Sequence, residues 1–259
     1  MKQDTFAGET IAYVDIGTGP SVLLLHSLGG GAWVWNSLIE RLSPTYRCIA
    51  PDLPGHGSSS YRQPFTIEGA ATSIAQLVDS LDAAPAAVIG VSLGGHVAIQ
   101  MHEQGPQRLG AMVLANHSLG GRPQARTMIE GLLARRRAMP EQDYAREYVA
   151  SRFSPEVSAD LLTRYEQSVL AMAPGAYETA FTALATMDAR AAAARISRPA
   201  LVVASSADVS SPADSVRQMH LTIPDSTYAL IEGANHFAYL QSPDSFNELV
   251  LAHFAAHPW

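Results

Sequence analysis

The chain has 259 residues, of which 47% are hydrophobic and 16% charged, a composition typical of a globular protein and not of a disordered one. Its formal net charge of −7 argues against a nucleic-acid-binding protein, which would normally present a basic surface. Because Met1–Asp4 carries no apolar signal region and no run of about 18 apolar residues is present, we expect a cytoplasmic protein that does not span a membrane.

Short apolar runs rich in β-branched residues recur along the chain and predict strands. Several are almost continuously apolar, as expected for strands of a sheet that is covered on both faces. The predicted strands are Thr10–Val14, Val22–Leu25, Arg47–Ala50, Ala86–Ile89, Ala111–Ala115, Ala200–Ala204 and Thr227–Ile231. The first belongs to Thr5–Val14, which resembles a hairpin at one edge with its turn at Ala7-Gly8. The single cysteine, Cys48, lies within a predicted strand and is expected to fill the core.

Helical patterns separate these strands. They cover Trp33–Leu42, Ile67–Leu81, Gly95–Glu103, Ser215–Leu221 and Pro243–Phe254. Strands that alternate with helices indicate a parallel sheet with helices on both faces. The sequence therefore predicts an α/β fold with a mostly parallel, doubly wound sheet.

One segment interrupts the alternation, because residues 119–195 contain no convincing strand. They hold instead the helical patterns Arg126–Arg137, Asp143–Ser151, Pro155–Ala171 and Ala176–Thr186, followed by a short alanine-rich helix at Ala189–Ala194. We interpret residues 119–195 as a helical cap inserted into a core that is made of residues 1–118 and 196–259.

Arginine is concentrated in the cap. Residues 120–198 hold 11 of the 17 basic side chains, all of them arginine, together with nine acids. Solvated helix faces explain this distribution. A second interpretation is that one arginine binds an anionic substrate, since a guanidinium group matches a carboxylate with two parallel hydrogen bonds.

The segment Gly90-Val91-Ser92-Leu93-Gly94 lies between a predicted strand and a predicted helix. A Gly-x-Ser-x-Gly match occurs by chance in about one chain in ten of this length. In the order strand, motif, helix, however, it is typical of a serine held on a sharp turn, with its hydroxyl exposed to a substrate. We therefore predict Ser92 as a nucleophile.

A serine nucleophile needs a general base and an acid that orients the base, and after this turn they follow in the order Ser, Asp or Glu, His. Asp208 comes just after the strand Ala200–Ala204, and His236 just after the last predicted strand. Loops at the carboxyl ends of parallel strands are where such sites are built. We predict Asp208 as the acid and His236 as the base. Among the other histidines, His96 is expected to pack near the turn.

An oxyanion hole requires two backbone N–H donors. One is predicted at Leu93, directly after the nucleophile, and the second at Leu28, in the glycine-rich loop that follows the strand Val22–Leu25. In the same region we interpret His26 as a residue that anchors the loop, and Asp52 as part of a structural loop beside the site. His102 and His220 are interpreted as exposed helix residues.

These motifs together resemble the α/β-hydrolase superfamily over essentially the whole chain. They are His26–Gly29, Asp52–Ser58, Gly90–Gly94, Asp208 and Gly233–Phe237. Within it the chain is most similar to the 3-oxoadipate enol-lactonase-like group, on the basis of His26–Gly29, Trp35, Pro174–Tyr177 and Ala185–Asp188. It departs from that group in having no tryptophan in the cap, since Trp33, Trp35 and Trp259 are the only ones.

The resemblance implies a serine hydrolase that cleaves a small-molecule ester or lactone through an acyl-enzyme, without a metal or organic cofactor. Other activities of the same three residues stay open: hydrolysis of a carbon–carbon bond, hydroxynitrile lysis and perhydrolysis. A hydrolase-like receptor that binds a ligand under the cap is a further alternative. Haloalkane dehalogenation is disfavoured, because that chemistry requires a carboxylate at position 92.

Overall fold

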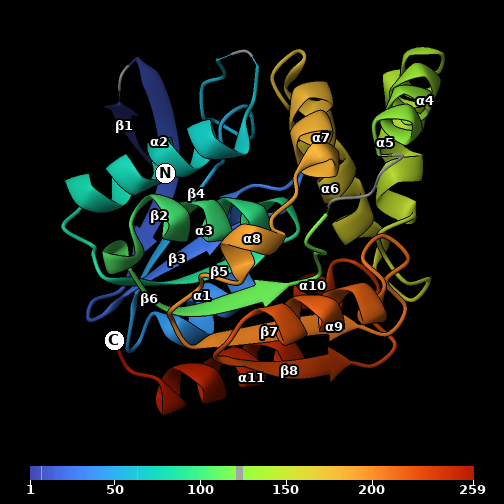
Figure 1. Ribbon diagram of the computed structural model, residues 1–259. Helices are drawn as coiled ribbons and strands as arrows, with labels where there is room; N and C mark the ends of the chain where they lie inside the picture. The colour runs from blue at the N-terminus through green and yellow to red at the C-terminus, as the bar shows by residue number, and fades with distance from the viewer. Residues whose placement is uncertain (7, 63, 121–124) are drawn as a thin grey trace.

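A single eight-stranded sheet organises the protein in the computed structural model, which describes residues 1–6, 8–62, 64–120 and 125–259 (Figure 1). The strand order is β1-β2-β4-β3-β5-β6-β7-β8. The strands are β1 Lys2–Phe6, β2 Glu9–Ile16, β3 Ser21–Leu25, β4 Arg47–Pro51, β5 Ala86–Val91, β6 Leu109–Ala115, β7 Ala200–Ser205 and β8 Ser226–Ile231. β1 and β2 are antiparallel at one edge, and the other six run parallel. The mostly parallel sheet predicted from the sequence is confirmed.

Helices cover both faces of this sheet. α2 (Ile67–Ser80), α3 (Leu93–Gln104), α8 (Arg190–Ala193) and α9 (Ala213–Thr222) pack in succession over one face, and α1 (Asn36–Leu42) and α11 (Pro243–Ala256) pack together over the other. A 3₁₀ turn, Ala32–Trp35, precedes α1, and α10 (Ala238–Gln241) precedes α11. Every residue of β3, β5, β6 and β7 is buried. Their apolar runs therefore reflect strands that contact helices on both sides.

The predicted cap helices lie between β6 and β7. They are α4 (Ala125–Arg137), α5 (Glu141–Ala150), α6 (Ala159–Leu170) and α7 (Ala176–Thr186), and Figure 1 shows them beyond the arrowheads of the parallel strands. α6 begins later than the predicted Pro155, because the Ser158 side chain accepts a hydrogen bond from the N–H of Leu161 and caps the helix there. Ala7 of the predicted hairpin turn and residues 121–124 of the predicted cap lie outside the described residues.

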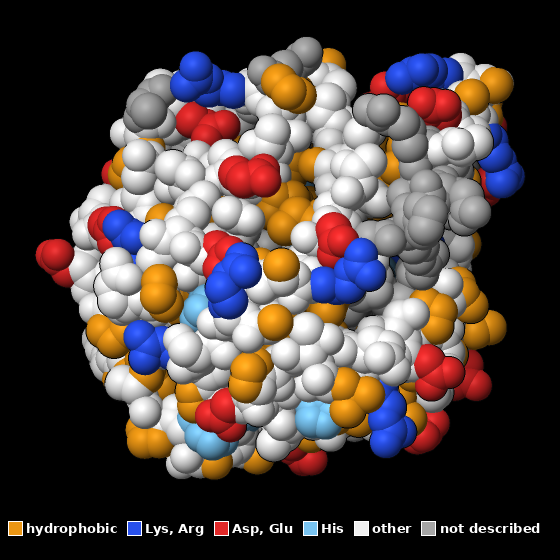
Figure 2. Space-filling model, in the orientation of Figure 1, with side chains coloured by type: hydrophobic (Ala, Val, Ile, Leu, Met, Phe, Trp, Pro, Cys, Tyr) orange, Lys and Arg blue, Asp and Glu red, His pale blue; other side chains and the backbone are white. Residues whose placement is uncertain are grey.

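Most cap arginines form ion pairs on the surface. Arg136 and Arg137 both contact Glu178, at 3.1 and 2.6 Å, and Arg195 contacts Glu103. On the face seen in Figure 2, basic and acidic side chains accordingly lie next to each other in several places. Solvated, paired charge thus explains much of the arginine content of the cap.

Two further expectations concern the core and the membrane. Cys48 is fully buried in β4, and burial raises the pKa of its thiol to about 12, as suits a core residue. Across the part of the chain that the structure describes, no helix is both long enough and apolar enough to cross a bilayer.

Four of the buried histidines, His26, His56, His96 and His117, predict a steep loss of stability in mild acid. Burial lowers their pKa values, to about 4, 3 and 4 for the first three and well below the usual range for His117. Between these values and the unfolded pKa near 6.5, the unfolded chain binds more protons than the folded one. The free energy of unfolding should therefore fall by about 1.4 kcal/mol per pH unit for each such histidine as pH drops below about 6.5.

Urea denaturation at pH 7.5, 6.5, 5.5 and 5.0 measures this slope. Carboxylates in ion pairs titrate at lower pH, below about 4, so they contribute little to the change in unfolding free energy between pH 7.5 and 5.0. His56→Gln should make the slope shallower, because it removes one of these buried imidazoles. An unfolding free energy that stays constant from pH 7 to pH 5 would contradict the prediction.

Candidate active site

Ser92 occupies the sharp turn between β5 and α3. Its backbone is held at φ 53° and ψ −112°, a conformation rare for residues other than glycine. The flanking glycines make the turn possible, because a Cβ atom at Gly90 would lie 2.5 Å from the carbonyl oxygen of Gly94. A Cβ atom at Gly94 would lie 2.1 Å from the carbonyl oxygen of Leu25. The motif therefore has a steric origin: any larger residue at either glycine would collide with the backbone.

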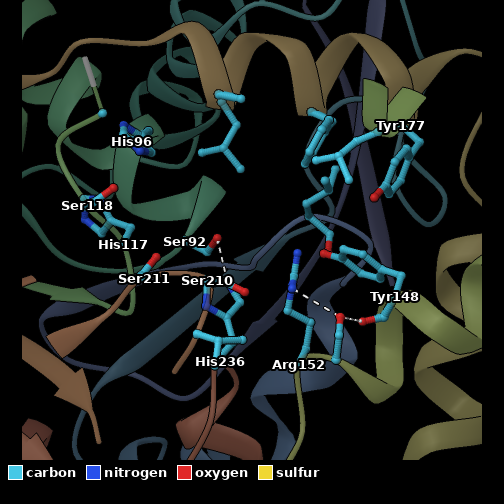
Figure 3. A pocket seen from close by; sticks show the side chains of 18 of the residues that line it. Ser92, His96, His117, Ser118, Tyr148, Arg152, Tyr177, Ser210, Ser211 and His236 are labelled. Carbon is cyan, nitrogen blue, oxygen red and sulfur yellow. Dashed lines mark hydrogen bonds between the residues drawn. The ribbon is translucent and has the colours of Figure 1, made fainter. Parts of the chain in front are cut away.

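Three residues from distant parts of the sequence meet at this turn. His236 places Nε2 3.0 Å from the Ser92 hydroxyl oxygen and Nδ1 2.8 Å from Oδ2 of Asp208. All three side chains are buried, with at most 6% of each residue exposed. Ser92, Asp208 and His236 follow β5, β7 and β8, so they gather at the carboxyl edge of the sheet. Figure 3 shows the contact between His236 and Ser92 at the base of a pocket.

The Asp208 carboxylate is fixed by four hydrogen bonds. Oδ1 accepts from the N–H groups of Ser210 and Ser211, at 2.8 and 2.9 Å. Oδ2 accepts from His236 and, at 3.1 Å, from the side-chain amide of Asn116. Sequence reasoning missed Asn116. Its signal was its place directly after a predicted strand, at the same edge of the sheet as the other three residues.

The protonation states follow from these contacts. Burial alone would raise the pKa of Asp208, but the hydrogen bonds from His236, Ser211 and Asn116 outweigh it, so the pKa lies below its usual value. Burial also lowers the pKa of His236 by more than Asp208 raises it, and the positive charge of Arg152 acts in the same direction as burial. At neutral pH the pair is therefore a carboxylate and a neutral imidazole, whose Nδ1–H faces Asp208 and whose Nε2 can accept the Ser92 proton.

The two residues predicted as oxyanion donors both lie at this site. Leu28 lines the same pocket as Ser92, and Leu93 is the first residue of α3, where backbone N–H groups have no partner within the helix. Two cap hydroxyls hold the Leu28 carbonyl: that of Tyr148 donates to it at 3.0 Å and that of Tyr165 at 3.2 Å. That the N–H groups of Leu28 and Leu93 bind an oxyanion stays a prediction.

The neighbouring polar residues are structural, as expected. His26 accepts the N–H of Leu53 at Nε2, 2.9 Å away, and donates from Nδ1 to the Ser27 carbonyl. Asp52 accepts the N–H groups of Ala32 and Ser58 on its two carboxylate oxygens. Both side chains thus tie loops together beside the site, and neither contacts Ser92 or His236 by a hydrogen bond in the described structure.

The remaining histidines correct one expectation. His102 is only 4% exposed and His220 is half-buried, so the interpretation of both as exposed helix residues was wrong. α8 packs against α3, and His102 accepts the N–H of Ser197, just after α8, at 3.2 Å. His96 packs near the turn as expected, with its ring centroid 4.8 Å from that of His117. Both rings line the pocket, which the sequence did not indicate for His117.

A cavity of about 480 Å³ lies between the Ser92 turn and the cap. On one side it is lined by Ser92, His236 and Leu28, and on the other by residues of α4, α5 and α7, among them Tyr148, and by Arg152, which follows α5. This volume suits a small organic molecule. No group of three or more His, Cys, Asp or Glu side chains arranged to bind a metal ion occurs in the described residues.

Comparisons with known proteins show which proteins this chain resembles. A family model described as "Alpha/beta hydrolase family" matches residues 22–249. The chain is 29% identical over 237 residues to a pimeloyl-[acyl-carrier protein] methyl ester esterase of Neisseria meningitidis, covering 88% of this chain and 91% of that one. A hydrolase from Pseudomonas aeruginosa superposes with a TM-score of 0.89 at 27% identity, over 98% of this chain and 97% of the other. An enol-lactonase from Burkholderia xenovorans LB400 has the same fold, with a TM-score of 0.89 at 23% identity over 98% and 100%.

Proposed function

Since the chain belongs to the alpha/beta hydrolase family, we propose that it is a serine hydrolase that cleaves a small-molecule carboxylic ester or lactone. The observation that carries the proposal is the hydrogen-bonded chain from Ser92 through His236 to Asp208, at 3.0 and 2.8 Å. Nucleophile, base and orienting acid within hydrogen-bond reach are what acyl transfer by serine requires.

In the proposed mechanism, the Ser92 oxygen attacks the carbonyl carbon of the substrate while Nε2 of His236 takes its proton. The N–H groups of Leu28 and Leu93 stabilise the oxyanion that forms. His236 then gives the proton to the leaving alkoxide, and an acyl-enzyme is left on Ser92. Water attacks this ester with His236 again as the base, and the acid is released. In a lactone both halves belong to one molecule, so ring opening and hydrolysis yield a single hydroxy acid.

The cap supplies the other half of the proposed site. We propose that residues 119–195 act as a cap over a core of residues 1–118 and 196–259, and that the cap shapes the substrate cavity and excludes water from it. Lactones belong in the test alongside esters because Pro174–Tyr177 and Ala185–Asp188 resemble the enol-lactonase-like group.

Covalent labelling tests the proposal without knowledge of the substrate. A fluorophosphonate should form one adduct per chain, and peptide mass spectrometry should locate it on Ser92. The labelled protein should lose turnover of p-nitrophenyl butyrate and of simple lactones in proportion to the adduct. A ligand receptor or a lyase should hydrolyse neither substrate class. Absence of both labelling and hydrolysis would refute the proposal.

A further inference from the structure

One cap arginine, Arg152, faces the cavity. It follows α5 and lines the cavity together with Ser92 and His236. Its guanidinium carbon lies 4.9 Å from the ring centroid of Tyr148, and Nη1 donates to the Ser151 hydroxyl at 3.2 Å. Figure 3 shows the side chain extended into the cavity beside Tyr148, on the side of His236 away from His96 and His117. Most of its five N–H donors are therefore available to a ligand.

Other described cap arginines differ from Arg152 in their partners. Those that pair with a carboxylate are Arg135 with Glu147, Arg136 and Arg137 with Glu178, Arg146 with Asp143, Arg190 with Asp188 and Arg195 with Glu103. Arg164 lies over the Trp33 ring, and Arg198, just beyond the cap, donates to the Pro106 carbonyl. Within the described ranges, no carboxylate lies within ion-pair distance of Arg152.

The charges that line the cavity also favour an anionic ligand. Among its described lining residues the only acid is Glu147, and it pairs with Arg135 at 2.6 Å. His96 and His117 are uncharged at neutral pH, because burial lowers their pKa values. One positive charge, on half-buried Arg152, is therefore left uncompensated on the cavity wall. A partly desolvated guanidinium held against an aromatic ring favours an anion and binds a carboxylate with two parallel hydrogen bonds.

We propose that Arg152 is the anion-binding residue of the cavity and that the substrate is an ester or lactone carrying a free carboxylate apart from the scissile bond. The inference deepens the proposed function and rests on it for the identity of the reacting group. Tyr148 supports the arrangement, since its ring packs against Arg152 while its hydroxyl donates to the Leu28 carbonyl at 3.0 Å. The carboxylate would thereby be held at a fixed position relative to the loop that is proposed to bind the oxyanion.

Matched anionic and neutral esters test the proposal. The monomethyl esters of succinic, glutaric and adipic acid carry the free carboxylate on the acyl side of the scissile bond. Acetate esters of hydroxy acids carry it on the leaving-group side. The corresponding primary amides are the neutral partners. In at least one of these two series, and at one chain length or more, the wild-type kcat/KM for the acid should exceed that for the matching amide. Arg152→Gln should reduce this ratio by about 10- to 100-fold, as expected for loss of a charge-assisted hydrogen-bonded pair. The ratio cancels any effect of Arg152→Gln that acts on both substrates alike, including the loss of a positive charge near His236.

Two further variants separate Arg152 from general effects of charge and folding. Arg164→Gln removes the same charge from an exposed cap position outside the cavity lining and should leave the ratio unchanged. Arg152→Lys keeps the charge but loses the planar guanidinium group, so it should retain part of the preference for the acid over the amide. If the wild-type enzyme does not distinguish acids from amides in either series, or if Arg152→Gln keeps the preference, the inference is overturned.

Direct binding distinguishes this inference from the proposed function. Isothermal titration of wild-type protein with adipate and glutarate should show binding that Arg152→Gln abolishes and Arg164→Gln retains. Dicarboxylate binding through Arg152 without any ester turnover or fluorophosphonate labelling would support the anion site and refute the hydrolase. Hydrolysis of neutral esters, without dicarboxylate binding or acid preference that depends on Arg152, would support the hydrolase and refute the anion site.

Discussion

Replacing Ser92 with alanine should lower kcat for a carboxylic ester by about 10⁴- to 10⁶-fold, the loss typical of removing a serine nucleophile. Without the hydroxyl, His236 has no proton to accept and no acyl-enzyme forms. Activity that remains would come from substrate binding and from the N–H groups proposed to stabilise the oxyanion. The fold should survive, because Ser92 Oγ has a hydrogen bond only with His236 among the described contacts and alanine fits the same turn.

Burst and steady-state kinetics with p-nitrophenyl butyrate measure this effect, with the thermal unfolding midpoint as a check on the fold. Ser118→Ala is the matched control, since Ser118 lines the same cavity but forms no hydrogen bond with His236 in the described structure. That control should keep activity near the wild-type level and should still react with the fluorophosphonate. A Ser92→Ala enzyme with wild-type turnover would rule out Ser92 as the nucleophile.

The second large effect is expected from Asp208→Asn, which should reduce kcat about 10⁴-fold at neutral pH. The two N–H donors of Ser210 and Ser211 keep the amide oxygen at the Oδ1 position. The amide nitrogen must then face Nδ1 of His236 and the side-chain amide of Asn116, where the carboxylate now accepts two hydrogen bonds. His236 would be forced to carry its proton on Nε2, so it could no longer accept the proton of Ser92.

Asp52→Asn provides the comparison for this variant. Asp52 is also a buried carboxylate that accepts two backbone N–H groups, but it forms no hydrogen bond with His236 in the described structure. That variant should lose stability in urea denaturation while the folded enzyme keeps its kcat. If Asp208→Asn retained kcat within tenfold of wild type, another group would have to orient His236.

The sequence predicted the scaffold well because each element depends on a local signal. α7 was predicted with its observed bounds, Ala176–Thr186, since Pro174 and Gly175 mark its start. The buried strands were likewise predictable from their apolar runs. The start of α6 was misjudged because Pro155 and Ser158 are both plausible helix starts, and only the hydrogen bond to Leu161 decides between them.

Features that depend on packing between distant segments could not be read in the same way. The burial of His102 requires α8 to lie against α3, and nothing in the helical pattern around His102 indicates that. Asn116 becomes part of the site only because β6 and β7 are neighbours, which brings it to Asp208. The sequence showed an excess of arginine in the predicted cap but not which arginine faces the cavity without a carboxylate partner, because that depends on how α4 to α7 are arranged.

The hydroxyls of Tyr148 and Tyr165 on the Leu28 carbonyl have a consequence for engineering. A cap exchanged for one from another member of the family would bring new pocket walls, but it would also remove both donors from the loop beneath it. Because this loop is proposed to bind the oxyanion, we expect the lost contacts to lower the rate on every substrate, whatever the fit of the new pocket. A successful graft must therefore keep a hydroxyl at both positions, so the two helices that carry them set the junctions of any chimera.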